Sequence, residues 1–291
     1  GAPGEEAVPT MSGKLWFMPR KSKDDPHYPV DTYDHETKTW TVITDESQYP
    51  EYADPIMNLI SCTEATEVFG GGFGEGGDMY ANPTVNINMI PGKHAEIIKR
   101  NGTANPHDLG TIGDVYGGGN QAAVVGNATI NIGSANEVTV NSMTYNPTTK
   151  VYTSGTATVE GAYITGNVYG GGKLADVTGN TNVNVCAKEA DDASTADVIE
   201  YKGVTISGTG YEGVTIAGNV FGGGKGIADS FTCAKAMIGK DGDGIDHPEG
   251  GTHVTIGNGT VMGNVYGGGE IGRVEKNTVV TIGLADVGSG E

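Results

Sequence analysis

ITGNVYGGG, residues 164–172, contains the phrase that decides the fold: a valine, an aromatic residue and three glycines. Five copies occur, numbered repeats 1 to 5 by their valines, Val68, Val115, Val168, Val220 and Val265. Successive valines lie 47, 53, 52 and 45 residues apart. A period of this length is typical of a solenoid, a propeller or a tandem array. The chain is therefore predicted to be a repeat protein.

The segments on both sides of the phrase alternate apolar and polar residues. IAGNVFGGG (216–224) and VMGNVYGGG (261–269) show the preceding flank, and ATINIG (128–133) and TNVNVC (181–186) show the following one. Alternation with period two, rich in Val, Ile and Thr and bounded by Gly and Asn, predicts short half-buried strands. Each repeat is expected to supply at least two of them.

The length of the repeat leaves two models open. The least interrupted stretch, 258–283, closes one cycle in 26 residues, which suits one coil of a parallel β-helix. The remaining residues of each repeat are either excursions from a single coil or a second, degenerate coil. We favour excursions, because solenoids commonly place insertions on loops of one face.

Four such excursions differ in character. Residues 89–102 are expected to form a short helix, and residues 138–159 a hairpin that turns at Asn146. Residues 186–201 are acidic and are expected to be helical, and residues 237–251 form a Gly/Asp-rich loop.

Residues 1–66 lack the phrase and are predicted to be an N-terminal β-rich cap, ahead of a five-repeat region at 67–291. This segment holds Trp16 and Trp40, with a strand expected at 13–19 and a hairpin at 30–44. A cap of this kind protects the open end of a solenoid. The opening GAPGEEAVP is interpreted as the start left after removal of a leader, and we expect the natural protein to continue beyond Glu291.

Composition narrows the class of protein. Glycine is 49 of 291 residues without a Gly-X-Y period and proline is only 12, which excludes collagen. A net charge of −19 argues against nucleic acid as a partner, since phosphate binding needs clustered Lys and Arg. No run of about 18 apolar residues is present, so no membrane span is expected.

The glycines after the aromatic residue are expected to allow either a corner with positive φ or a close approach of backbone. GGGK occurs at 170–173 and 222–225. Neither lysine is followed by Ser or Thr, so the pattern does not predict a phosphate-binding loop.

The cysteines and acidic loops offer little chemistry. Cys62, Cys186 and Cys233 are too few for a disulfide framework and are expected to be reduced, buried thiols. One weak calcium candidate is the loop DGDGID, with ligands Asp241, Asp243 and Asp246. A solvated acidic turn is the more ordinary interpretation. No other cofactor is predicted.

The alternation places the aromatic residues in one column. If the valines point inward, the aromatic residues and the polar residues before each valine share the outer face. This column is either a buried stacking ladder or an exposed platform for a ligand. The candidate ligand-binding residues are Tyr116, Tyr169, Phe221, Tyr266, Asn167, Asn219 and Asn264.

No catalytic motif is recognisable. The six histidines are dispersed, and neither HExxH nor GxSxG occurs. A polysaccharide-active enzyme with paired acids stays an alternative, because absence of a motif is weak evidence. We expect a protein that is not an enzyme.

GNVYGGG followed by ADVTGNTNVNV (175–185) resembles the repeat of large adhesin-like surface proteins of Gram-negative gut bacteria. The resemblance covers about residues 67–288 and implies an all-β, right-handed parallel β-helix. It brings no characterised ligand. A rival resemblance is the kelch β-propeller, through VYGGG and the hairpin YDHETKTW (33–40).

These observations together predict an extracellular adhesion or binding module on the bacterial cell surface. Its side wall would meet a glycan or a host or bacterial surface protein. The alternatives are a polysaccharide-active enzyme and a structural spacer in a surface fibre.

Overall fold

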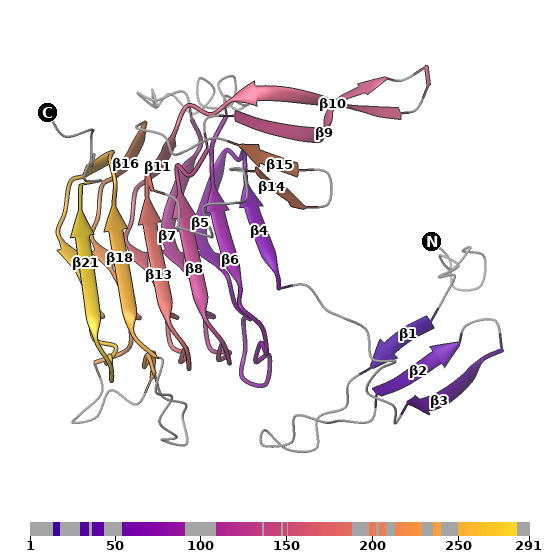
Figure 1. The fold of residues 1–291 in the computed structure, drawn as a ribbon, viewed down its shortest axis with the longest axis horizontal. Helices are drawn as coiled ribbons and strands as arrows, with labels where there is room; N and C mark the ends of the chain where they lie inside the picture. The colour runs from indigo at the N-terminus through magenta and orange to yellow at the C-terminus, as the bar shows by residue number, and fades with distance from the viewer. Residues whose placement is uncertain are drawn as a thin grey trace, which may run out of the picture. The chain divides into compact units, whose positions relative to one another are not determined.

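Figure 1 shows the computed structural model of the chain, which separates into two compact units, Gly1–Ala53 and Asp54–Glu291. The structure describes residues 14–17, 30–34, 37–43, 54–90, 109–135, 137–146, 148–149, 151–187, 198–201, 204–207, 213–228, 235–239 and 250–283. All regular elements in these ranges are strands, as the all-β prediction requires. The described residues include no helix that could cross a bilayer.

The first unit holds a three-stranded antiparallel sheet in the order β1-β2-β3. Its strands are β1 (Lys14–Phe17), β2 (Val30–Asp34) and β3 (Thr39–Ile43). Strands β2 and β3 form the hairpin expected at 30–44, and β1 is the strand expected at 13–19. Both predictions for this segment are confirmed.

The second unit is built on two parallel sheets, to which every repeat contributes. The eight-stranded sheet contains β5 (Glu64–Phe69), β7 (Thr111–Tyr116), β11 (Ala162–Ile164), β12 (Val168–Tyr169), β16 (Val214–Ile216), β17 (Val220–Phe221), β19 (Thr260–Val261) and β20 (Val265–Tyr266). The six-stranded sheet contains β4 (Ile56–Leu59), β6 (Thr84–Ile87), β8 (Ala128–Ile132), β13 (Thr181–Val185), β18 (Thr252–Ile256) and β21 (Thr278–Ile282). A line of single parallel bridges, Met79–Val124–Val177–Ile238–Val274, lies between the two strands of each repeat in sequence.

Equivalent residues of successive repeats pair directly. Val68 pairs with Val115, Val115 with Val168, Val168 with Val220, and Val220 with Val265. Each repeat is thus one layer, so the extra residues are excursions and not a second coil. Parallel pairing between repeats also differs from the antiparallel four-stranded blades of a propeller, so the propeller alternative does not describe this unit.

The boundary between the units lies earlier than the sequence predicts. Strand β4 pairs in parallel with β6, although its segment lacks the glycine phrase. Residues 54–66 therefore pack with the repeats, and the repeat unit begins at Asp54 and not at residue 67.

The core consists of columns of like residues from successive layers, whose strands lie side by side in Figure 1. Val115, Val168 and Val220 are fully buried and face aliphatic side chains of the six-stranded sheet such as Ile130 and Val183. A smaller column of Val124, Val177 and Ile238 fills the bridge line. Because the period-two alternation sends the valines inward, the aromatic residues next to them point to the opposite face of their sheet.

Two excursions combine into a separate antiparallel sheet in the order β10-β9-β15-β14. The hairpin β9 (Glu137–Asn146) and β10 (Val151–Thr158) confirms the prediction for 138–159, and the Asn146 side chain accepts the N–H groups of Thr148 and Thr149. Strands β14 (Val198–Tyr201) and β15 (Val204–Ser207) come from the next excursion.

Residues 198–201 are therefore a strand where a helix was expected, because pairing with β15 overrides the local composition. Residues 188–197 lie outside the described ranges, as do most of the helix expected at 89–102 and most of the loop at 237–251.

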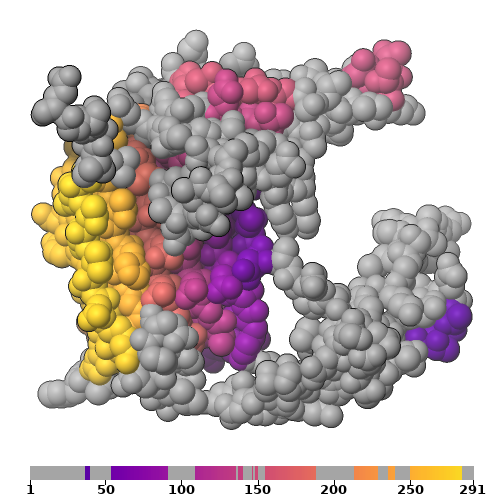
Figure 2. Space-filling model, viewed as in Figure 1, coloured from indigo at the N-terminus to yellow at the C-terminus, as the bar shows by residue number. Residues whose placement is uncertain are grey.

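The space-filling view shows the last repeat, in yellow, on one side of the second unit (Figure 2).

Candidate functional site

The aromatic residues of the five repeats form one continuous stack. Neighbouring ring centroids are 4.7 to 5.1 Å apart, with interplanar angles of 4 to 12°. Direct parallel pairing sets this spacing, because adjacent strands lie about 4.8 Å apart. The stacking residues are Phe69, Tyr116, Tyr169, Phe221 and Tyr266.

Burial determines which rings of this stack a ligand could contact. Tyr116 and Tyr169 are 0 % exposed and Phe221 is 6 % exposed, whereas Tyr266 in the last layer is 44 % exposed. The faces of the inner rings are covered by neighbouring rings, so a ligand cannot stack on them. Of the four aromatic candidates, Tyr266 alone is exposed.

The glycines beside the stack are required by close approach between layers. A Cβ on Gly117 would lie 2.3 Å from the carbonyl oxygen of Gly170, and one on Gly170 would lie 2.2 Å from that of Gly222. None of the glycines of the five phrases has a positive φ. Of the two roles expected for them, the structure shows the close approach.

The polar residues before each valine form a ladder along the edge of the stack. The Asp114 carboxylate accepts the backbone N–H of Asn167 at 2.8 Å. The Asn167 side-chain oxygen accepts the N–H of Asn219 at 2.7 Å, and that of Asn219 accepts the N–H of Asn264 at 2.9 Å. The candidate asparagines therefore bind the next layer of their own chain, with Asn264 at the exposed end.

A second polar row comes from the residue that follows the three glycines. The backbone N–H of Lys173 donates to the carbonyl of Gly119, and that of Lys225 donates to the carbonyl of Gly172. This residue is therefore hydrogen-bonded to the preceding layer. Its side chain reaches a further layer back. Lys173 Nζ lies 2.6 Å from Glu67 Oε1, and Lys225 Nζ lies 3.4 Å from Asp114 Oδ2.

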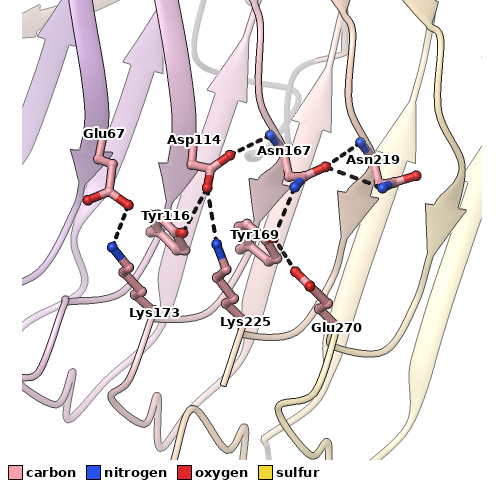
Figure 3. Close-up of polar contacts among 9 residues, drawn as sticks. All are labelled: Glu67, Asp114, Tyr116, Asn167, Tyr169, Lys173, Asn219, Lys225 and Glu270. Carbon is pink, nitrogen blue, oxygen red and sulfur yellow. Dashed lines mark hydrogen bonds and ion pairs between the residues drawn. The ribbon is translucent and has the colours of Figure 1, made fainter. Parts of the chain in front are cut away.

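Figure 3 shows Tyr116 and Tyr169 between these two polar rows. The Tyr116 hydroxyl donates to Asp114 at 3.1 Å. The Tyr169 hydroxyl donates to the Glu270 carboxylate and accepts from Asn167 at 3.1 Å. Lys225 Nζ also lies 5.7 Å from the centre of the Tyr169 ring, a cation–π contact.

Burial and nearby carboxylates keep both tyrosines protonated. Burial, followed by the charge of Asp114, raises the pKa of Tyr116 far above its ordinary value. Burial, followed by the hydrogen bond to Glu270, does the same to the pKa of Tyr169. Neither hydroxyl can act as a base near neutral pH, and each lysine of the row is paired with a carboxylate. The arrangement is suited to fixing the alignment of layers.

A further ladder runs along the six-stranded sheet, on the face opposite its core valines. The Nδ2 of Asn86 donates to Asn58 at 3.1 Å, that of Asn131 to Asn86 at 3.0 Å, and that of Asn184 to Asn131 at 2.9 Å. Asn86, Asn131 and Asn184 are buried. These amides form hydrogen bonds with one another across layers, so each buried amide has a hydrogen-bond partner.

The proposed metal ligands Asp241, Asp243 and Asp246 lie outside the described residues, as does Cys233. In the ranges that are described, no cluster of three or more His, Cys, Asp or Glu residues is arranged to hold a metal ion. Cys186 is buried, and burial raises the pKa of the half-buried Cys62.

Sequence reasoning missed Lys173, Lys225 and Glu270. The signal was present, because Glu67 and Asp114 replace the asparagine of the other repeats and the two GGGK lysines follow two repeats later. Each acid therefore coincides with a lysine two layers on.

Compared with protein-family models, curated proteins and solved structures, the chain has no match.

Proposed function

We propose that the two parallel sheets are walls of a right-handed parallel β-helix that serves as a binding module on the bacterial cell surface. In this function the layered unit is the scaffold, and the sheet β10-β9-β15-β14 is the part that meets the partner. The partner is a glycan or a host or bacterial surface protein. The extracellular location is supported by the resemblance of the GNVYGGG repeats to those of adhesin-like surface proteins.

The observation that carries this proposal is the pairing of two excursions into one sheet. Strand β15 pairs with β9 across more than fifty residues of sequence, from Val204–Val140 to Ser207–Glu137. Loops carry binding in many proteins because a rigid scaffold positions them. An excursion that forms its own sheet offers a larger ordered surface than a single loop.

The root of this sheet is anchored to the layers. Val138 and Val159 are fully buried and pack with Ile90. The N–H of Met89 bonds to the carbonyl of Gly161 at 2.8 Å. The aromatic stack is by contrast occupied in holding layers together, which favours the excursion sheet as the contact surface.

The test compares the wild-type protein with two variants on a glycan array and a panel of host and bacterial surface proteins. In the first, Asn-Gly replaces residues 142–153, which shortens the hairpin beyond its pairing with β15. In the second, Tyr266→Ser alters the exposed end of the aromatic column. We expect the shortened hairpin to lose binding while Tyr266→Ser keeps it.

If Tyr266→Ser loses binding and the shortened hairpin keeps it, the aromatic column is the binding surface. A reducing-sugar assay on the bound glycans separates binding from catalysis, since sugar release would favour the polysaccharide-active enzyme. If neither variant changes binding, while removal of repeats shortens a surface fibre without loss of attachment, the spacer function is correct.

A further inference from the structure

A short corner joins the two parallel sheets between β18 and β19. It consists of Gly257, Asn258 and Gly259, whereas the connections from β8 to β11 and from β13 to β16 carry excursions. The N–H of Gly257 donates to the carbonyl of Val185 at 2.8 Å, which anchors the corner to the preceding layer. Asn258 itself is exposed. The corner thus places an accessible asparagine directly before a glycine, a pair that occurs at one other place in the sequence, at Asn101.

The structure requires glycine at position 259. Its φ is +86°, a value that residues with a side chain rarely adopt. A Cβ on Gly259 would also lie 3.0 Å from the Sγ of Cys186 and 3.0 Å from the carbonyl oxygen of Val214. The backbone conformation and the packing on the preceding layer therefore both keep glycine after Asn258.

The Asn258 side chain is held against the backbone nitrogen of Gly259. That N–H donates to the Asn258 Oδ1 at 2.8 Å. Because Oδ1 is bonded to Cγ, this contact brings Cγ close to the backbone nitrogen that can close a five-membered ring with it. Glycine has no side chain to shield its nitrogen. Holding two reacting groups together in this way lowers the entropic cost of their reaction.

We propose that Asn258 is a site of spontaneous deamidation through a cyclic imide. The Gly259 nitrogen gives its proton to a solvent base and forms a bond to Cγ of Asn258. The bond from Cγ to the side-chain nitrogen then breaks, and that nitrogen takes up a proton and leaves as ammonia. Water opens the imide at either carbonyl, which gives aspartate or isoaspartate. One water is consumed for each ammonia released, and nothing is oxidised or reduced.

Isoaspartate at this corner would disturb the pairing of β19. The main chain gains one carbon atom at the corner, and a neutral amide becomes a charged carboxylate. Strand β19 pairs in parallel with β16, and the N–H of Met262 donates to the carbonyl of Ile216 at 2.8 Å. A longer corner shifts β19 against this partner. We therefore expect the N–H of Met262 to exchange with solvent faster after the modification.

The test incubates the folded wild-type protein at mildly alkaline pH and follows each asparagine by peptide mass spectrometry, with fragmentation that separates isoaspartate from aspartate. Asn264 is the internal control, because it is also exposed but is followed by Val265, whose branched side chain shields the attacking nitrogen. Asn258→Gln is the control variant, since its longer side chain does not form the five-membered ring. A urea-unfolded sample shows the reaction without the folded corner.

We expect isoaspartate at Asn258 in the folded protein, formed at least about tenfold faster than any change at Asn264, which is a barrier lower by about 1.4 kcal/mol. The N–H of Met262 should lose protection from hydrogen exchange in the aged wild-type protein and keep it in aged Asn258→Gln. Conversion of Asn258 only after unfolding, or no faster than Asn264, would overturn the proposal. Equal protection of Met262 in the two aged proteins would overturn the effect on β19.

Discussion

The first glycine of each of the first four phrases has its structural reason in the neighbouring layer. The carbonyl oxygen of Gly222 occupies the place that a side chain on Gly170 would need, at 2.2 Å from its Cβ. The order of residues does not decide whether these glycines serve a positive φ or a close approach, because a sequence contains no distances between layers. The structure shows that the layers themselves exclude a side chain.

Gly170→Val is therefore expected to destabilise the second unit by about 3 kcal/mol, since the added atoms force adjacent backbones apart. Urea unfolding followed by circular dichroism measures the change. Gly74→Val serves as the control and should shift the midpoint little, because the space around Gly74 is open. Equal effects of the two substitutions would mean that the layers are not packed as closely as described.

The buried tyrosines make stability fall at high pH. Their pKa values are raised in the folded protein, by burial first, while an unfolded tyrosine titrates near pH 10. Their contribution is constant below about pH 10 and decreases above it, by up to about 1.4 kcal/mol per pH unit for each tyrosine. The double variant Tyr116→Phe/Tyr169→Phe should show a shallower loss in urea titrations at alkaline pH. An unchanged slope would show that these hydroxyls titrate normally.

Strands and their pairing show how far sequence reasoning reaches. The period-two alternation predicts both parallel strands of each repeat, because the order of apolar and polar residues shows which face of a strand is buried. The turn at Asn146 predicts the hairpin at 138–159. Sequence reasoning misses β4, since IMNL carries no glycine phrase, and it misses β14, whose pairing with β15 comes from outside the local sequence. Pairs such as Glu67 with Lys173, 106 residues apart, need knowledge of how repeats align.

The ion pair between Glu67 and Lys173 tests whether repeats 1 and 3 are aligned as described. Lys173→Glu places two carboxylates together, and we expect a loss of about 1 kcal/mol, because both side chains are about 30 % exposed. Adding Glu67→Lys should restore most of the stability by reversing the pair. Arg273→Glu is the control, since its partner Glu275 lies only two residues away in the same repeat.

Urea unfolding of the single and double variants measures the coupling between the two sites. If the double variant is no more stable than the sum of its single changes predicts, the two side chains do not interact across two layers. A measurable coupling would support the rule that the residue after the glycines reaches two repeats back.

The second unit as a whole is held by contacts between adjacent layers. Stacked repeats of this kind draw their stability from each unit and its nearest neighbours. Here the contacts comprise parallel strands, a ring stack and ladders of asparagine, with the ion pairs bridging over two layers. Each repeat is a single layer in direct register with the next, although equivalent valines lie 45 to 53 residues apart in the sequence.

Disulfide cross-linking of paired cysteines tests this claim most directly. Thr129 pairs with Asn182 in the next layer, and Asn182 pairs with His253 one layer further. With the native cysteines replaced, Thr129→Cys/Asn182→Cys spans about 4.8 Å between strands, within disulfide reach, whereas Thr129→Cys/His253→Cys spans about 9.6 Å. Non-reducing electrophoresis should detect a cross-link in the first variant and none in the second. Cross-linking of the second variant, or of neither, would contradict one layer per repeat.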